Sequence, residues 1–181
     1  ELFNYNHKDF KINNEADANE VLNRLSNAFE IESVDKKTRQ KQSKPPYTTS
    51  TMQQDASNKL GFNAKKTMQI AQKLYEGIEL EDETVGLITY MRTDSIRLSQ
   101  DFIGSTYNFI ESKYGKEYIG SVKVSKKVEN VQDAHEGIRP TSINRTPESI
   151  KKFLSNDEYK LYRMIYYRAL ASLMKSATTI N

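Results

Sequence analysis

The chain has 181 residues, enough for one domain or for one domain and part of another. Cysteine is absent, which excludes a disulfide framework and a thiolate zinc site. No apolar run approaches the roughly 20 residues that cross a bilayer. The chain opens at Glu1 and shows no signal-peptide pattern, so we expect part of a longer, cytoplasmic protein. Hydrophobic content is 36% and mean hydropathy is −0.76, values that suit amphipathic helices around a core.

The net charge is only +3, but the charge is unevenly distributed. The segment from Asp35 to Lys73 carries nine lysines and arginines against two acids, a net charge of +7, so the remainder sums to −4. A basic segment in a nearly balanced chain predicts a polyanionic partner. The alternative is a lysine-rich face that is simply solvated.

The first 44 residues predict a strand, a helix and a second strand. Polar and apolar residues alternate over residues 1–13, which is typical of a strand. Asn14 or Asp17 can cap a helix through Phe29, since apolar residues recur there at three- and four-residue spacing. Residues 31–44 predict an exposed strand, and the two prolines that follow it block regular structure.

Residues 50–76 predict two helices joined by a short turn. Ser50 and Gln53 form a capping-box pattern that starts a helix through Leu60. Asn63 caps a second helix over residues 64–76, and Gly77 ends it. This is the outline of a helix-turn-helix, and it carries four lysines (Lys59, Lys65, Lys66 and Lys73). An α-hairpin that binds no DNA has the same outline.

An acidic loop over residues 79–83 leads into the central motif of the chain. Consecutive carboxylates on a loop are more often solvated than metal-bound, so we predict no metal site here. A short apolar run then reaches Tyr90, followed by Arg92 and a Thr-Asp-Ser cluster. A tyrosine hydroxyl can attack a phosphodiester while an arginine holds a phosphate oxygen. The alternative is that Tyr90, one of 11 tyrosines, only packs.

The last third of the chain predicts three helices and a polar loop. Ser99 caps a helix over residues 100–114 that Gly115 ends, and residues 116–132 predict a loop. Thr146-Pro147 starts a short helix to Leu154. Asn156 or Asp157 opens the longest helix, to about Ser176, whose tyrosines form a buried face or, alternatively, stack on bases. Residues 177–181 predict the start of a strand.

Three segments together resemble motifs of the bacterial type IA DNA topoisomerases, in the same order along the chain. They are Pro-Tyr-Thr-Thr-Ser-Thr-Met-Gln-Gln-Asp-Ala-Ser (residues 46–57), Leu-Ile-Thr-Tyr-Met-Arg-Thr-Asp-Ser (87–95) and Asp-Ala-His-Glu-Gly-Ile-Arg-Pro-Thr (133–141). Met91 and Thr93 favour the topoisomerase I branch over the topoisomerase III branch. Gly137 stands where alanine is commoner in the family.

The resemblance implies a mainly α fold: a helical domain with a helix-turn-helix-like element, flanked by short β segments from an interrupted arch domain. On this basis residues 1–45 are a partial β-rich arch domain with a strand-helix-strand order. Residues 46–176 are the helical domain that carries the catalytic tyrosine. Residues 177–181 begin the strand that returns to the arch domain.

The resemblance also implies an isomerase that relaxes negatively supercoiled DNA without ATP. Tyr90 attacks one strand and forms a 5′-phosphotyrosine link, the other strand passes, and the 3′-hydroxyl reseals the break. Arg92 binds the scissile phosphate and His135 helps to position it. Arg139 holds the DNA backbone or only braces the site, and Asp94 orients Arg92 or caps the next helix. From the residues alone, a structural role is the favoured interpretation of His135.

The family's Mg²⁺-binding acidic module has no match here, because no Asp-x-Asp pattern follows a buried strand. We therefore expect Mg²⁺ ligands outside this chain and no relaxation by the fragment alone. Predicted partners are single-stranded or underwound DNA, contacted by Arg92, His135, Arg139, Lys65 and Lys66, and the remaining domains of the same polypeptide. No membrane partner is predicted, and the expected location is the nucleoid. The alternative function is a non-catalytic helix-turn-helix-type DNA-binding module.

Overall fold

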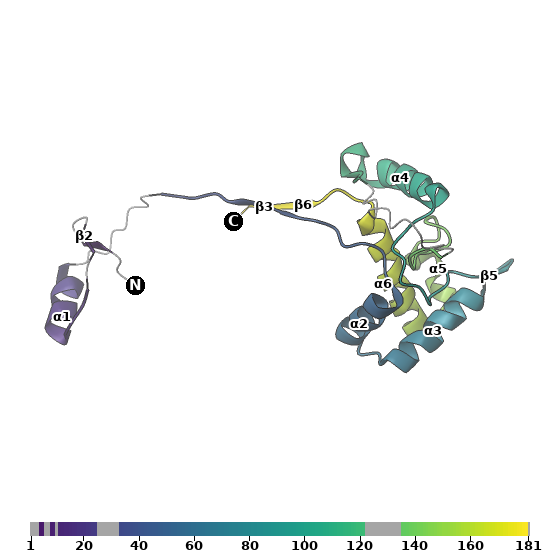
Figure 1. Cartoon of the computed structure of the whole chain (residues 1–181), viewed down its shortest axis with the longest axis horizontal. Coiled ribbons are helices and arrows are strands. Elements are labelled where there is room, and N and C mark those ends of the chain that lie inside the picture. Colours follow the sequence, from purple (N-terminus) through teal and green to yellow (C-terminus); the bar gives the residue numbers. More distant parts are fainter. Residues whose placement is uncertain (1–3, 6–7, 10, 25–32, 122–134, 181) are drawn as a thin grey trace. The chain divides into compact units, whose positions relative to one another are not determined.

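The computed structural model describes all residues except 1–3, 6–7, 10, 25–32, 122–134 and 181. The chain divides into two units, residues 1–37 and residues 38–181 (Figure 1). The assignment of residues 1–45 and 177–181 to an arch domain stays a prediction. The ends of the first predicted helix and of the predicted loop at 116–132 lie outside the described residues.

The first unit contains two very short strands and one helix. Strands β1 (Asn4–Tyr5) and β2 (Lys8–Asp9) pair antiparallel, where the sequence predicted one strand. Helix α1 (Glu15–Arg24) follows. Glu15 and Asp17 lie in its first turn, where acidic side chains interact favourably with the helix dipole. The Asn14 side chain accepts a hydrogen bond from the Asp17 amide, which confirms Asn14 as a cap.

The second unit is mainly helical, and its two ends meet in a β-ribbon. Strand β3 (Thr38–Lys41) pairs antiparallel with β6 (Ala177–Ile180), with Thr38 opposite Ile180. All eight residues of the ribbon are exposed. The prediction of a mainly helical fold with short flanking strands is therefore confirmed.

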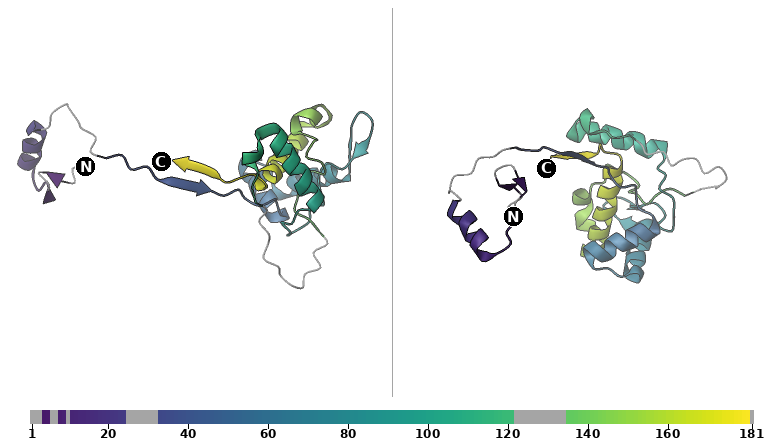
Figure 2. Two further views of the ribbon diagram at one scale, coloured as in Figure 1. Left: turned by 90° about the horizontal axis from the view of Figure 1, so that it is seen from above. Right: turned by 60° about the vertical axis from the view of Figure 1, so that its left-hand side comes forward.

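Helices α2 (Thr49–Leu60), α3 (Ala64–Glu76) and α6 (Asn156–Ser172) pack against one another (Figure 2). Gly61, at φ +69°, joins α2 to α3, and the Asn63 side chain caps α3 as predicted. The core between these helices includes Met52, Ala56, Leu74, Leu161 and Ile165, all fully buried. Burial of this apolar area is the main stabilising contribution to the unit.

The remaining elements surround this packing. A hairpin whose strands have two residues each, β4 (Ile78–Glu79) and β5 (Thr84–Val85), follows α3. Helix α4 (Gln100–Tyr114) leads into the 3₁₀ turn η1 (Lys116–Tyr118). Helix α5 (Pro147–Ile150) and the 3₁₀ turn η2 (Lys151–Phe153) precede α6. The predicted caps Ser99 and Thr146 both accept hydrogen bonds from the first turns of their helices.

Two predicted helix ends are wrong, one for a local reason and one because of a tertiary contact. The capping box of α2 is Thr48 with Thr51 rather than Ser50 with Gln53, so the helix starts earlier. Helix α6 starts after Ser155 and ends at Ser172 rather than near Ser176. The chain leaves the helix there because the backbone pairs with residues after α4: the Gly120 amide donates to Leu173 and the Lys175 amide to Tyr118.

Candidate active site

The segment before Tyr90 pairs with the segment after His135, although they are about 50 residues apart in sequence. Ile88 and Pro140 form an antiparallel bridge. The Thr89 amide donates to the Arg139 carbonyl at 2.9 Å, and the Thr141 amide donates to Leu87 at 2.9 Å. The backbone ladder therefore fixes where the two motifs meet, with Leu87 and Ile88 buried beneath them.

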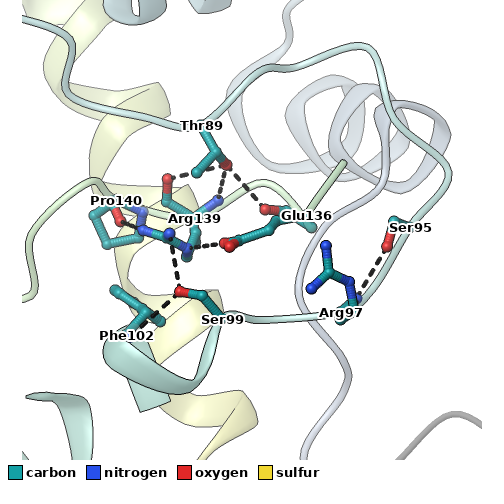
Figure 3. Close-up of polar contacts among 9 residues, drawn as sticks. Thr89, Ser95, Arg97, Ser99, Phe102, Glu136, Arg139 and Pro140 are labelled. Atoms are coloured by element: carbon teal, nitrogen blue, oxygen red, sulfur yellow. Dashed lines mark hydrogen bonds and ion pairs between the residues drawn. The ribbon is translucent and has the colours of Figure 1, made fainter. Parts of the chain in front are cut away.

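The Thr89 side chain adds a second connection between the same two segments. Its hydroxyl donates to the Gly137 carbonyl at 2.9 Å and accepts from the Arg139 amide at 3.0 Å (Figure 3). A buried peptide group needs such a partner because an unpaired one is costly. The residue directly before Tyr90 is thus fixed to the motif that carries His135.

The ring of Tyr90 contacts two other aromatic rings. Its centroid is 5.4 Å from that of Tyr75, at the C-terminal end of α3, in an edge-to-face contact. Its centroid is also 5.5 Å from that of the His135 ring. Tyr90 is half-buried, and within the described part of the chain its hydroxyl has no hydrogen-bond partner. The contacts hold the ring while the hydroxyl stays available to a ligand.

Arg92 is exposed on a loop whose backbone is anchored to helix α2. The Thr49 hydroxyl donates to the Met91 carbonyl at 2.7 Å and accepts from the Thr93 amide at 2.9 Å. Met91 is fully buried, so the loop is also fixed to the core. Asp94 is exposed and does not cap the next helix, because Ser99 is the cap of α4.

Arg139 is held inside the protein by several contacts (Figure 3). Its Nε donates to Glu136 at 2.5 Å, and its terminal nitrogens donate to the Pro140 carbonyl and the Ser99 hydroxyl. Its guanidinium also lies 4.5 Å from the Phe102 ring centroid. Only 13% of the side chain is exposed. These contacts favour the bracing role over a DNA contact for Arg139.

Glu136 is the counter-ion of Arg139, and its environment changes its acidity. Burial alone works to raise the pKa of this carboxyl, but the hydrogen bond and charge of Arg139, with hydrogen bonds from Ser99, outweigh burial. The pKa of Glu136 therefore lies below its ordinary value. The carboxylate stays ionised at neutral pH and holds Arg139 in place.

A second charged cluster supports the other side of the His135 motif. The Ile138 amide donates to the Tyr47 carbonyl at 2.8 Å, and the Tyr47 hydroxyl donates to Asp55 at 2.5 Å. Burial works to raise the pKa of Asp55, but Lys59, Tyr47 and Arg168 together lower it. The Arg168 guanidinium lies 4.6 Å from the Tyr47 ring centroid, which links α6 to the same cluster.

Lys65 and Lys66 are not brought to Tyr90. Both lie in the first turn of α3, whereas Tyr75, which contacts Tyr90, lies near its other end, roughly 14 Å along the helix axis. Lys66 forms an ion pair with Asp157 at 2.7 Å and lies over the Phe62 ring. Lys65 is exposed. Their assignment as DNA contacts stays a prediction.

The acidic loop makes ion pairs with residues near α5. Glu81 pairs with Lys152, and Glu83 pairs with Arg145 at 2.9 Å. Among the residues that the structure describes, no group of three or more His, Asp or Glu side chains could hold a metal ion. Likewise, none of the described helices is long and apolar enough to span a membrane.

Sequence reasoning assigned no role to four residues that shape this site: Thr49, Tyr75, Thr89 and Glu136. Two of them carried a usable signal. Glu136 precedes Arg139 by three residues, a spacing that allows an ion pair, and Tyr75 is the last aromatic residue of the predicted helix before the motif. The two threonines act through long-range contacts, which spacing along the chain does not reveal.

Comparison with known proteins places the whole chain in one family. A family model described as DNA topoisomerase matches residues 1–181. DNA topoisomerase 1 of Rickettsia felis is 49% identical over 170 residues, which cover 92% of this chain and 22% of that protein. DNA topoisomerase 1 of Rickettsia prowazekii is 48% identical over 173 residues, covering 93% of this chain and 22% of that protein.

A solved structure agrees with these matches. The structure of full-length topoisomerase I from Thermotoga maritima superimposes with a TM-score of 0.71 at 39% identity. The match covers 97% of this chain and 27% of the Thermotoga chain. The chain thus spans about a fifth of the length of the curated relatives that it matches.

Proposed function

Because this chain belongs to the DNA topoisomerase family, we propose that it is the tyrosine-bearing part of a type IA enzyme. The full-length enzyme relaxes negatively supercoiled DNA by transient cleavage of one strand, strand passage and religation. The observation that carries this proposal is the meeting of Tyr90 with His135, from two motifs that the backbone pairs side by side.

In this proposal Tyr90 is the nucleophile. Its oxygen bonds to phosphorus as the bond from phosphorus to the 3′ oxygen breaks, which leaves a 5′-phosphotyrosine and a free 3′-hydroxyl. The proton of the tyrosine hydroxyl must leave during attack, and the departing 3′ oxygen takes up a proton, so the step releases no net proton. The covalent link conserves the energy of the phosphodiester, so religation by the 3′-hydroxyl needs no ATP.

Arg92 and His135 stabilise and position the phosphate. Arg92 is exposed two residues after Tyr90, and a guanidinium binds phosphate through paired hydrogen bonds. His135 contacts the Tyr90 ring, so its imidazole can donate to a phosphate held on the tyrosine. The first turn of α2 contacts the Arg92 loop, and the positive end of a helix dipole favours an anion nearby. Arg139 acts indirectly, by bracing the His135 motif.

The substrate and setting follow from the same proposal. The partner is single-stranded or underwound DNA together with the remaining domains of the polypeptide, in the cytoplasm at the nucleoid. Mg²⁺ is bound by residues of those domains, which lie outside this chain. The fragment alone is then inactive because it carries only half of the active site.

Relaxation of a negatively supercoiled plasmid tests this function. The full-length enzyme is expected to relax the plasmid without ATP, and the Tyr90→Phe variant is expected to show no relaxation. Tyr107→Phe is the matched control, because its hydroxyl donates to the Gly120 carbonyl away from the site, and it should remain active. Normal relaxation by Tyr90→Phe would reject the proposal.

A further inference from the structure

Thr49 forms hydrogen bonds to the backbone on both sides of a single residue, Arg92. The Thr49 hydroxyl donates to the Met91 carbonyl at 2.7 Å and accepts from the Thr93 amide at 2.9 Å. The Thr49 amide donates to the Thr93 carbonyl at 2.9 Å. The partners on the loop lie 42 and 44 positions away in sequence. One residue thus holds the peptide groups on both sides of Arg92.

The anchor itself is rigid. Thr49 is the first residue of α2, and the Thr48–Thr51 capping box fixes the turn to which it belongs. Helix α2 is attached to the core through Met52 and Ala56, both fully buried. The Thr49 amide is one of the first-turn donors that a helix cannot satisfy internally, and Thr93 satisfies it here.

This arrangement fixes the backbone of Arg92 while leaving its side chain exposed. An arginine on a free loop would lose backbone freedom each time it bound a phosphate, and that loss weakens binding. A backbone that is already held removes this loss. The side chain alone then has to order when the anion arrives.

We propose that Thr49 is a positioning residue, which holds Arg92 in place to bind the phosphate of the DNA strand. The proposal rests on the proposed function, because it takes Arg92 as the phosphate ligand. The segment Pro46–Ser57 then does more than start helix α2, because the Thr49 hydroxyl also holds the loop that carries Arg92.

Binding of a single-stranded oligonucleotide tests this role in the full-length topoisomerase carrying Tyr90→Phe, in which binding stays non-covalent. Dissociation constants are measured over a series of salt concentrations. Arg92→Ala is expected to lower the slope of log affinity against log salt by about 0.7, the value for one phosphate contact on a single strand. An unchanged slope would mean that Arg92 does not bind a phosphate. It would overturn the assignment of Arg92 as the phosphate ligand and of Thr49 as its positioning residue.

Thr49→Val removes the hydroxyl with little change in shape, and Thr49→Ser retains it. With Arg92 present, Thr49→Val is expected to weaken binding about fivefold and to lower the salt slope, whereas Thr49→Ser stays within about twofold. In the Arg92→Ala background, Thr49→Val should have no further effect. An equal loss in both backgrounds, or an unchanged slope, would mean a purely structural role and would overturn the proposal.

Thr67→Val is the matched control, because the hydroxyl of this buried threonine on α3 donates to the carbonyl of Asn63, the residue that caps the same helix. It should leave affinity and slope unchanged. If Thr49→Val lowers the melting temperature below the assay temperature, Thr49→Ala measured in the cold carries the same comparison. The plasmid test with Tyr90→Phe separates the proposed function from the proposed role of Thr49. Loss of relaxation in Tyr90→Phe would support the function even if the binding comparison of Thr49 and Arg92 overturned the positioning role.

Discussion

At the scale of single residues, two threonine hydroxyls hold the loop that carries Tyr90 and Arg92. Thr89 fixes the peptide before Tyr90 to the His135 motif, and Thr49 fixes the peptides on both sides of Arg92. Neither reactive side chain is itself held by a hydrogen bond in the described residues. The backbone is ordered in advance, and the groups proposed to meet DNA are left available, which is how preorganisation lowers the cost of binding.

Glu136 should make stability depend on pH in a way that one substitution can isolate. Since its folded-state pKa lies below the ordinary value of 4.5, the carboxylate stabilises the fold above about pH 4.5. This contribution is lost as the pH falls through the folded-state pKa. Glu136→Gln should therefore destabilise by about 1–2 kcal/mol at pH 7, and the difference should shrink below pH 4.5.

Urea unfolding of both proteins between pH 3 and pH 7 measures this difference. Glu111→Gln, an exposed carboxylate on α4, is the control and should change stability by less than about 0.5 kcal/mol. A Glu136→Gln difference that is the same at pH 3 and pH 7 would contradict a role for the ionised carboxylate.

At the scale of elements, caps and turns decide where each helix begins and ends. The sequence predicted α3, α4 and α5 correctly at their starts, because Asn63, Ser99 and Thr146 are caps that act within one turn. It misplaced the end of α6, because the chain there pairs with residues 118–120, a contact that no local pattern encodes. A tertiary contact thus accounts for this error, whereas the start of α2 was misplaced because the local capping box is Thr48 with Thr51.

Two glycines in the second unit should respond to alanine in opposite directions. Gly61 has φ +69°, which an alanine adopts only with strain, so Gly61→Ala should destabilise by about 1 kcal/mol. Gly104 lies inside α4, and the position that a Cβ would occupy is open, so Gly104→Ala should stabilise by about 0.5–1 kcal/mol. Thermal unfolding of the two variants tests the sign, and a gain from Gly61→Ala would contradict the assigned turn.

At the scale of the whole molecule, the second unit brings three distant segments to one place. Tyr47, Ile88 and the segment from Ile138 to Pro140 are joined by two antiparallel bridges, and α2, α3 and α6 of the same unit pack against one another. The sequence predicted that these motifs belong together through resemblance, and it named Tyr90 and His135, which the structure does bring together. It could not predict that Lys66 is paired with Asp157 or that Arg139 is enclosed, since both depend on packing.

Covalent capture of DNA tests the central claim, that Tyr90 is the nucleophile, most directly. Single-stranded DNA labelled at its 3′ end is incubated with the full-length topoisomerase and Mg²⁺, and the protein is then separated on a denaturing gel. A 5′-phosphotyrosine retains the downstream piece, so label should travel with the protein and should be lost in Tyr90→Phe. Label that persists in Tyr90→Phe would assign the chemistry to another residue and contradict this account.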